Sequence, residues 1–273
     1  MHQPATNGSP PELRLTGLHV YPIKAAGGLA PTEWDVDAVG LRYDRRWMVV
    51  DTGGVMLSQR DHPRLALVRP SPGEETLRVE APGMRPVELP LRPATAVGLE
   101  VAIWDDRCAA IWCGERAAAW FSELLERDCS LVYMPDSTIR PADPAYAPGS
   151  YRVSFADAFA FLLASEESLA ELNRRLETPL PMNRFRPNLV IAGGEPFGED
   201  RLTEFQMGGV RFRVVKPCDR CVVTTTDQAT GERGVEPLRT LASFRRRDGK
   251  VYFGQNVIHD GAGRLRVGDR LRV

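Results

Sequence analysis

Short β-type runs separated by turn residues dominate the first hundred residues, and this spacing restricts the chain to a β-rich fold. Residues 46–50 are rich in β-formers and lead into Asp-Thr-Gly-Gly, so we predict a β-hairpin that closes with residues 55–57. Proline and glycine separate the other runs, and we expect further strands at residues 13–21, 65–68, 77–80 and 87–89. Many short strands of this kind are typical of a barrel or a sandwich.

The last hundred residues return to the same pattern. Residues 190–192 form an apolar run that ends at a Gly-Gly pair, and apolar residues alternate with arginines over residues 210–214. Strict alternation indicates a half-buried strand. We also expect a strand at residues 222–226 and a closing hairpin at residues 265–271.

Two segments have helical spacing instead. Residues 115–126 place apolar side chains on one face, and a second helix follows Ser165, which can cap it. Residues 135–150 are rich in proline, alanine and aspartate without periodicity, as a linker would be. We therefore predict a mainly β (α+β) fold of two β-barrel-like units with a few peripheral helices. The expected divisions are a disordered tail at residues 1–10, a first unit at residues 11–134 and a second at residues 135–273.

Charge and composition exclude several classes of protein. The formal net charge is -1, so the chain lacks the basic surplus that nucleic-acid binding normally needs. No apolar run approaches the roughly 18–20 residues that span a bilayer, and residues 1–10 lack the apolar core of a secretion signal. The 5 cysteines, an odd number, do not suit a secreted disulfide framework. We expect a cytoplasmic protein with no membrane span and no nucleic-acid partner.

Cys218 and Cys221 form a CxxC pair between two predicted strands, and four interpretations are open. A thioredoxin-like redox pair normally begins a helix, whose N-terminus lowers the thiol pKa. Structural zinc needs four ligands, and the second pair would be Cys108 with Cys113 at an unusual spacing. A single thiolate on a metal that a cofactor otherwise holds needs only one cysteine. The two cysteines can also be buried thiols with a purely structural role.

The motifs around this pair resemble those of the MOSC family. In the second half they are Phe-Ala-Asp at 155–157, Asn-Arg-Phe-Arg-Pro-Asn at 183–188, Pro-Cys-Asp-Arg-Cys at 217–221, Thr-Thr at 224–225, Glu-Pro-Leu at 236–238 and Phe-Gly-Gln at 253–255. In the first half, Tyr-Pro-Ile-Lys at 21–24, Asp-Arg-Arg-Trp at 44–47 and the run at 59–65 resemble the β-barrel domain that precedes MOSC. The resemblance runs from about residue 11 to residue 273 and is greatest to the mitochondrial amidoxime-reducing component and its bacterial counterparts.

The resemblance implies a molybdenum–molybdopterin cofactor, with Cys221 as the metal ligand and a catalytic residue. Asp157 is implied as a second catalytic residue, which hydrogen-bonds near the metal or relays a proton. The implied cofactor-binding residues are Lys24, Arg45, Arg186, Asn188, Asp219 and Arg220. Arginine suits the phosphate of the cofactor because a guanidinium donates two charge-assisted hydrogen bonds. Arg186 precedes a proline, so we expect its backbone to be extended.

The implied activity is the reduction of N-hydroxylated compounds by a molybdenum-dependent reductase. The chain carries no evident flavin, nicotinamide or iron–sulfur signature, so electrons would come from a ferredoxin- or cytochrome b5-like protein and its reductase. The alternative is a sulfur-carrier or cofactor-sulfuration protein that works with a pyridoxal-phosphate desulfurase, and a cofactor-storage module is a third possibility. The sequence departs from the family pattern at Ala25, Ala158, Phe159 and Asn256, which bears on substrate range.

Overall fold

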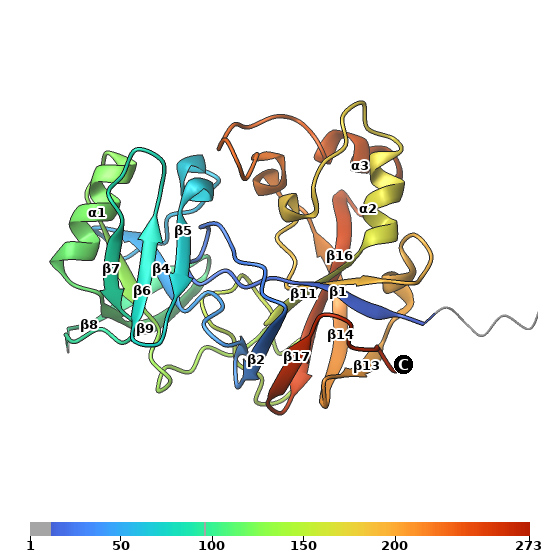
Figure 1. Ribbon diagram of the computed structural model, residues 1–273, viewed down its shortest axis with the longest axis horizontal. Helices are drawn as coiled ribbons and strands as arrows, with labels where there is room; N and C mark the ends of the chain where they lie inside the picture. Colours follow the sequence, from blue (N-terminus) through green and yellow to red (C-terminus); the bar gives the residue numbers. More distant parts are fainter. Residues whose placement is uncertain (1–11, 96) are drawn as a thin grey trace, which may run out of the picture.

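The computed structural model describes residues 12–95 and 97–273, and the predicted tail at residues 1–10 lies outside them. The chain is mainly β, which confirms the fold class that the strand spacing predicted. In Figure 1 a group of smaller sheets lies on the left and one large curved sheet lies on the right. Among the described residues, no helix combines the length and the apolar character that a bilayer span requires.

The large sheet has seven strands in the order β1-β12-β11-β16-β14-β13, with β15 attached to β16. Only β11 and β12 run parallel, and all the other pairs are antiparallel. A mainly aliphatic core that also contains Phe161, Phe205 and Phe212 packs on this sheet. Its strands are β1 (Arg14–Leu18), β11 (Phe161–Ser165), β12 (Leu189–Ala192), β13 (Glu204–Met207), β14 (Val210–Asp219), β15 (Arg246–Arg247) and β16 (Lys250–Asp260).

The left-hand part holds a four-stranded sheet, in the order β4-β10-β9-β8, and a three-stranded sheet of β5, β6 and β7. Both pack around one apolar core that includes Trp47 and Phe121. Strands β6 and β7 confirm the runs predicted at residues 77–80 and 87–89. The strands are β4 (Trp47–Asp51), β5 (Arg69–Pro72), β6 (Thr76–Glu80), β7 (Val87–Pro90), β8 (Gly98–Ile103), β9 (Asp106–Trp112) and β10 (Cys129–Tyr133).

A third small sheet joins the two halves of the sequence. It has the order β17-β2-β3, so β2 (Glu33–Asp37) and β3 (Gly40–Leu41) pair with β17 (Gly263–Arg266) from the far end of the chain. Strand β1 likewise pairs with β12 of the second half. Strand pairing therefore crosses the boundary predicted near residue 135, and a division there stays a prediction.

The two predicted helices form with bounds close to those expected. Helix α1 spans Glu115–Leu125, and α2 spans Glu166–Asn173. Ser165 caps α2, since its side chain accepts a hydrogen bond from the Ser168 amide. Helix α3 (Leu238–Phe244) was not predicted, and it lies with α2 beside the large sheet (Figure 1).

Two predicted strands are short 3-10 helices instead. Residues 65–67 of the first fall in η1 (Pro63–Leu67), where Pro63 occupies a first-turn position that its missing N–H and fixed φ favour. Residues 222–225 of the second fall in η4 (Val222–Thr225), because the Thr224 and Thr225 hydroxyls donate to carbonyls three residues earlier and tighten the turn. The other 3-10 helices are η2 (Met182–Arg184) and η3 (Gly198–Arg201).

The first predicted hairpin forms over a short stretch. Strand β4 turns at Asp51, whose Oδ1 accepts hydrogen bonds from two turn amides. The returning segment bridges Val50 through Met56, and its Leu57 amide donates to the Val49 carbonyl at 2.8 Å. The prediction of a closing hairpin at residues 265–271 is wrong. Strand β17 pairs with β2, and beyond Gly268 the chain moves to another partner, since Arg272 bridges Gln206.

Candidate functional site

A cavity of about 310 Å³ lies where segments from the two halves of the sequence meet. This cavity is not the largest, since one of about 420 Å³ lies around Arg46. The cavity of about 310 Å³ is distinguished by its lining, which contains two thiols and six cationic side chains. All eight site residues predicted from the sequence lie in its wall, namely Lys24, Arg45, Asp157, Arg186, Asn188, Asp219, Arg220 and Cys221.

The cavity is strongly positive in a chain whose net charge is only -1. Its two carboxylates, Asp157 and Asp219, are already paired, with Lys24 and Lys250 respectively. Four of the six cations have no carboxylate within ion-pair distance among the residues that the structure describes, namely Arg60, Arg186, Lys216 and Arg220. Unpaired cations in a recess attract an anion and strengthen its hydrogen bonds, so the cavity suits an anionic ligand.

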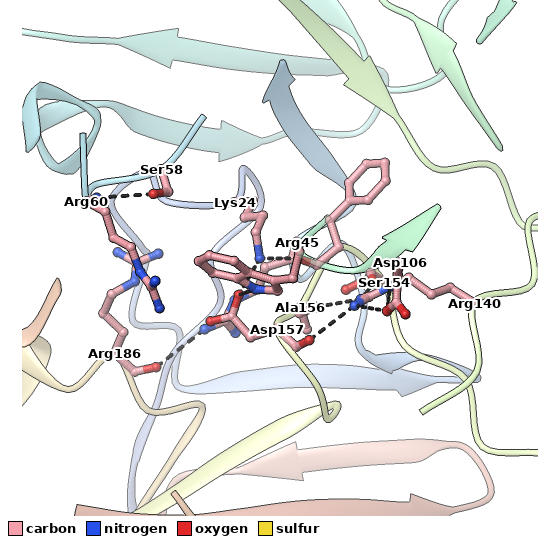
Figure 2. Close-up of polar contacts among 12 residues, drawn as sticks. Lys24, Arg45, Ser58, Arg60, Asp106, Arg140, Ser154, Ala156, Asp157 and Arg186 are labelled. Atoms are coloured by element: carbon pink, nitrogen blue, oxygen red, sulfur yellow. Dashed lines mark hydrogen bonds and ion pairs between the residues drawn. The ribbon is translucent and has the colours of Figure 1, made fainter. Parts of the chain in front are cut away.

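Lys24 and Asp157 form an asymmetric ion pair at one side of the cavity (Figure 2). The Lys24 Nζ donates to Asp157 Oδ1 at 2.6 Å and to the Phe155 carbonyl at 2.8 Å. The Lys24 side chain is 7% accessible to solvent, whereas the Asp157 side chain is 73% accessible. Partial enclosure raises the pKa of Asp157, but the Lys24 charge outweighs it and holds that pKa below its ordinary value. Asp157 is therefore ionised at neutral pH and accepts hydrogen bonds there.

Two arginines that line the cavity share one aromatic ring. The guanidinium carbons of Arg45 and Arg186 lie 4.4 and 4.3 Å from the centre of the Tyr21 ring. Asn188 orients Arg45, since its Oδ1 accepts from the Arg45 Nη1 at 3.0 Å. Burial raises the pKa of Tyr21 to about 12 despite both guanidiniums, and burial lowers the pKa of Arg186 to about 10. Both arginines are thus held in place, and Arg186 stays charged at neutral pH.

The backbone around the cavity adopts unusual conformations. Arg186 has φ of +54°, so the expectation of an extended backbone before Pro187 is wrong. Arg45 at +48°, Ala25 at +66° and Trp104 at +53° are also left-handed and also line the cavity. Non-glycine residues pay a conformational cost at positive φ, and such residues concentrate at functional sites.

The two cysteines lie at the end of a strand, not between two strands. Cys218 is in β14, and Cys221 immediately precedes η4. The Arg220 Nη1 donates to the Cys218 sulfur at 2.9 Å, and its Nη2 donates to the Phe185 carbonyl at 2.7 Å. Burial raises the pKa of the Cys218 thiol even though Arg220 opposes it. Both thiols are free and only partly buried, so each can meet a ligand in the cavity.

The zinc interpretation finds no support in this arrangement. Cys108 is a residue of β9 and belongs to the apolar core around that strand, and Cys113 packs against the core that contains Trp47 and Phe121. No group of three or more histidine, cysteine or acidic side chains suited to a metal occurs within residues 12–95 and 97–273. The second pair of ligands that structural zinc would need is therefore not beside Cys218 and Cys221.

The sequence reasoning missed several residues of this site. Trp104 lines the cavity, and Arg140 holds the loop that carries Asp157. The Arg140 guanidinium is buried and donates to the carbonyls of Ser154 and Asp157 at 2.9 and 3.1 Å (Figure 2). No local pattern marks these residues, because their roles arise from contacts between distant segments.

The chain matches two family descriptions in succession. Residues 12–128 match the MOSC N-terminal beta barrel domain, and residues 150–272 match the MOSC domain. With relatives of more than 30% identity along most of its length, the chain belongs to the family that joins these two domains, which confirms the resemblance.

Particular relatives share most of this chain. Over 271 residues it is 37% identical to the mitochondrial amidoxime-reducing component 1 of Mus musculus, which covers 92% of this chain and 79% of that protein. It is 34% identical to the Homo sapiens protein of the same name, over 92% of this chain and 80% of that protein. It is also 33% identical to the molybdenum cofactor sulfurase of Homo sapiens. That match covers 90% of this chain but only 30% of the sulfurase.

Proposed function

We propose that this chain is a molybdenum-cofactor-dependent reductase of N-hydroxylated compounds, with Cys221 as the protein ligand to the metal. The observation that carries the proposal is a positive cavity with a partly accessible thiol in its wall. The 37% identity to a protein named for amidoxime reduction supports the same reaction class.

The residues of the cavity fit an anionic, sulfur-bound cofactor. Arg186 and Arg220 have no carboxylate partner among the described residues, and the Arg220 Nε is buried without a hydrogen-bond partner. An unpartnered buried donor favours an acceptor beside it. Arg45, Arg186 and Lys24 would hold the phosphate and pterin, and Cys221 would supply the soft thiolate that molybdenum favours. When bound, the molybdenum–molybdopterin group supplies the two-electron redox chemistry.

The overall reaction takes up two electrons and two protons per substrate. The N–O bond of an amidoxime breaks, and the products are the amidine and one water molecule. Asp157 is ionised at neutral pH, so it accepts a hydrogen bond from the N–OH or amino group of the substrate and orients it. Electrons come from a separate ferredoxin- or cytochrome b5-like protein with its reductase, which remains part of the proposal.

The first test compares two cysteine variants in protein made by a cofactor-producing host. In the wild type we expect molybdenum by elemental analysis and turnover of benzamidoxime with a chemically reduced dye. Cys221→Ser should lose the metal and the turnover, whereas Cys218→Ser should keep at least about half of the metal, because its sulfur already contacts Arg220. Zinc in place of molybdenum, or equal losses in the two variants, would contradict the assignment.

A second candidate function follows from the relatives named as molybdenum cofactor sulfurases. The chain spans only 32% and 30% of these two proteins, and a sulfuration or sulfur-carrier role would involve desulfurase chemistry as the source of the sulfur. In that case the Cys221 thiolate would attack the outer sulfur of a desulfurase persulfide. The donor S–S bond would break, the donor cysteine would leave as a thiolate, and mass spectrometry would detect the persulfide formed on Cys221. A protein that carries molybdenum and reduces amidoximes without such a donor excludes this candidate.

A further inference from the structure

Trp104 occupies a position in a turn where its residue type is unfavourable. Strand β8 ends at Ile103 and β9 begins at Asp106, and these two residues pair directly. Trp104 is therefore the first of two residues in a tight turn, and its φ is +53°. Glycine or asparagine normally occupies such a position, because a side chain crowds the backbone at positive φ. A tryptophan here indicates that the indole is needed where this turn places it.

The indole lies in the wall of the cavity and contacts residues of the site. Its Nε1 donates to Asp157 Oδ1 at 3.0 Å, and the Arg60 guanidinium carbon lies 4.2 Å from the ring centre. Trp104 is 43% accessible to solvent, so much of the ring is not used for packing. A large aromatic surface that is open within a polar cavity is available for a ligand to stack on.

A second set of contacts fixes the position of this turn relative to the loop of Asp157. Asp106 Oδ2 accepts two hydrogen bonds from the Arg140 guanidinium, at 3.0 Å from Nε and 2.7 Å from Nη2. The same guanidinium donates to the carbonyls of Ser154 and Asp157. Figure 2 shows Arg140 bridging Asp106 and the loop that carries Asp157. The indole is therefore held beside Asp157 before any ligand arrives.

We propose that Trp104 is a specificity-determining residue that favours substrates with a flat aromatic group next to the N-hydroxylated group. This inference rests on the proposed function and deepens it. Asp157 orients the polar end of the substrate, and the indole stacks on the ring attached to it. An aromatic contact of this kind favours an aromatic substrate over a small aliphatic one by about twofold to tenfold.

The test compares benzamidoxime with acetamidoxime in Trp104→Gly and Trp104→Phe. Glycine adopts the positive φ without strain, so this variant removes the ring without endangering the fold. We expect the ratio of kcat/KM for benzamidoxime over acetamidoxime to fall about twofold to tenfold in Trp104→Gly, through KM for benzamidoxime. In Trp104→Phe the ratio should stay within about twofold. If both variants lose both substrates equally, Trp104 only holds Asp157, and the inference is overturned.

Calorimetry separates this inference from the proposed function. The dissociation constants of both compounds are measured for wild type, Trp104→Gly and Trp104→Phe, independently of turnover. If wild type binds but does not reduce benzamidoxime, the proposed reaction fails, and a weaker affinity for benzamidoxime alone in Trp104→Gly still supports the aromatic contact. If wild type prefers neither compound, the inference about Trp104 is wrong even when the reductase activity is present.

Discussion

The ion pair between Lys24 and Asp157 joins a buried cation to a carboxylate that faces the cavity. In Asp157→Asn the Lys24 ammonium keeps its hydrogen bond to the Phe155 carbonyl but loses the negative charge that it pairs with. We expect the free energy of unfolding at pH 7 to fall by about 1–3 kcal/mol, which is less than for a fully buried pair because one partner is accessible. Turnover should fall at least about tenfold. Urea unfolding and the amidoxime assay measure the two effects.

The pH dependence of this stabilisation has a definite sign. The pKa of Asp157 in the folded protein is held below its ordinary value of 3.8. The contribution is therefore complete above about pH 5 and is lost as the pH falls through the folded pKa. Asp136→Asn is a matched control. The exposed Asp136 carboxylate forms an ion pair with the buried Arg46, as Asp157 does with Lys24, but this pair does not line the site cavity. Equal loss of turnover in the two variants would mean that Asp157 acts only through stability.

At the residue scale, the sequence predicted the site wherever a motif marked it. Cys221, Arg45 and Lys24 stand in recognisable motifs, and all three line the cavity. Their chemical roles stay predictions. The sequence could not predict Trp104 or Arg140, because Trp104 contacts a residue 53 positions away and Arg140 contacts one 14 positions away. The positive φ of Arg186 was also not predictable from the following proline, which biases the backbone the other way.

Among the elements, β16 contains the Phe-Gly-Gln motif, and the structure explains its glycine. Gly254 has φ of +78°, and a Cβ there would lie 2.6 Å from the Leu163 carbonyl oxygen of the neighbouring strand. We expect Gly254→Ala to destabilise the protein by about 1–3 kcal/mol more than Gly209→Ala. Gly209 is the matched control, since its φ is +80° but no atom lies within 4 Å of its Cβ position. Equal midpoints of urea unfolding for the two variants would contradict this explanation.

Helices and strands that are determined by residues close in sequence were predicted well. Those that depend on contacts with distant segments were not. The Ser165 cap and the apolar face of α1 are local, and both helices form close to the predicted bounds. Residues 222–226 have β-branched side chains that favour a strand, yet the hydroxyls of Thr224 and Thr225 turn the backbone into η4. Arg184 reinforces this turn by donating to the Thr225 carbonyl at 2.9 Å. That contact comes from a segment about 40 residues away.

For the whole molecule, the exchange of strands between the two halves predicts that neither half folds alone. A fragment of residues 135–273 lacks the β1 partner of β12 and the β2 partner of β17. We expect this fragment to show no cooperative urea transition and poor dispersion of amide signals in NMR spectra. Co-expression with residues 1–134 should restore both. A cooperative transition in the isolated fragment would contradict the prediction and would support an independent second domain.

The overall class of fold followed from the sequence, but the connectivity did not. Alternation and turn residues indicate where strands form, and they do not indicate which strands pair. Nothing local to residues 265–271 distinguishes a hairpin from a strand that pairs with residues 33–36. Pairing over such separations is decided by the total apolar burial of the assembled sheets.

The pairing of β1 with β12 also determines the order in which the protein can assemble during its synthesis. β12 leaves the ribosome about 170 residues after β1, and β17 leaves more than 200 residues after β2. At about 5–20 residues per second, the first strand waits on the order of ten seconds or more for its partner. During that interval its unpaired edge is exposed to other nascent chains, so we expect the growing chain to be prone to pairing with the wrong strand until β12 emerges.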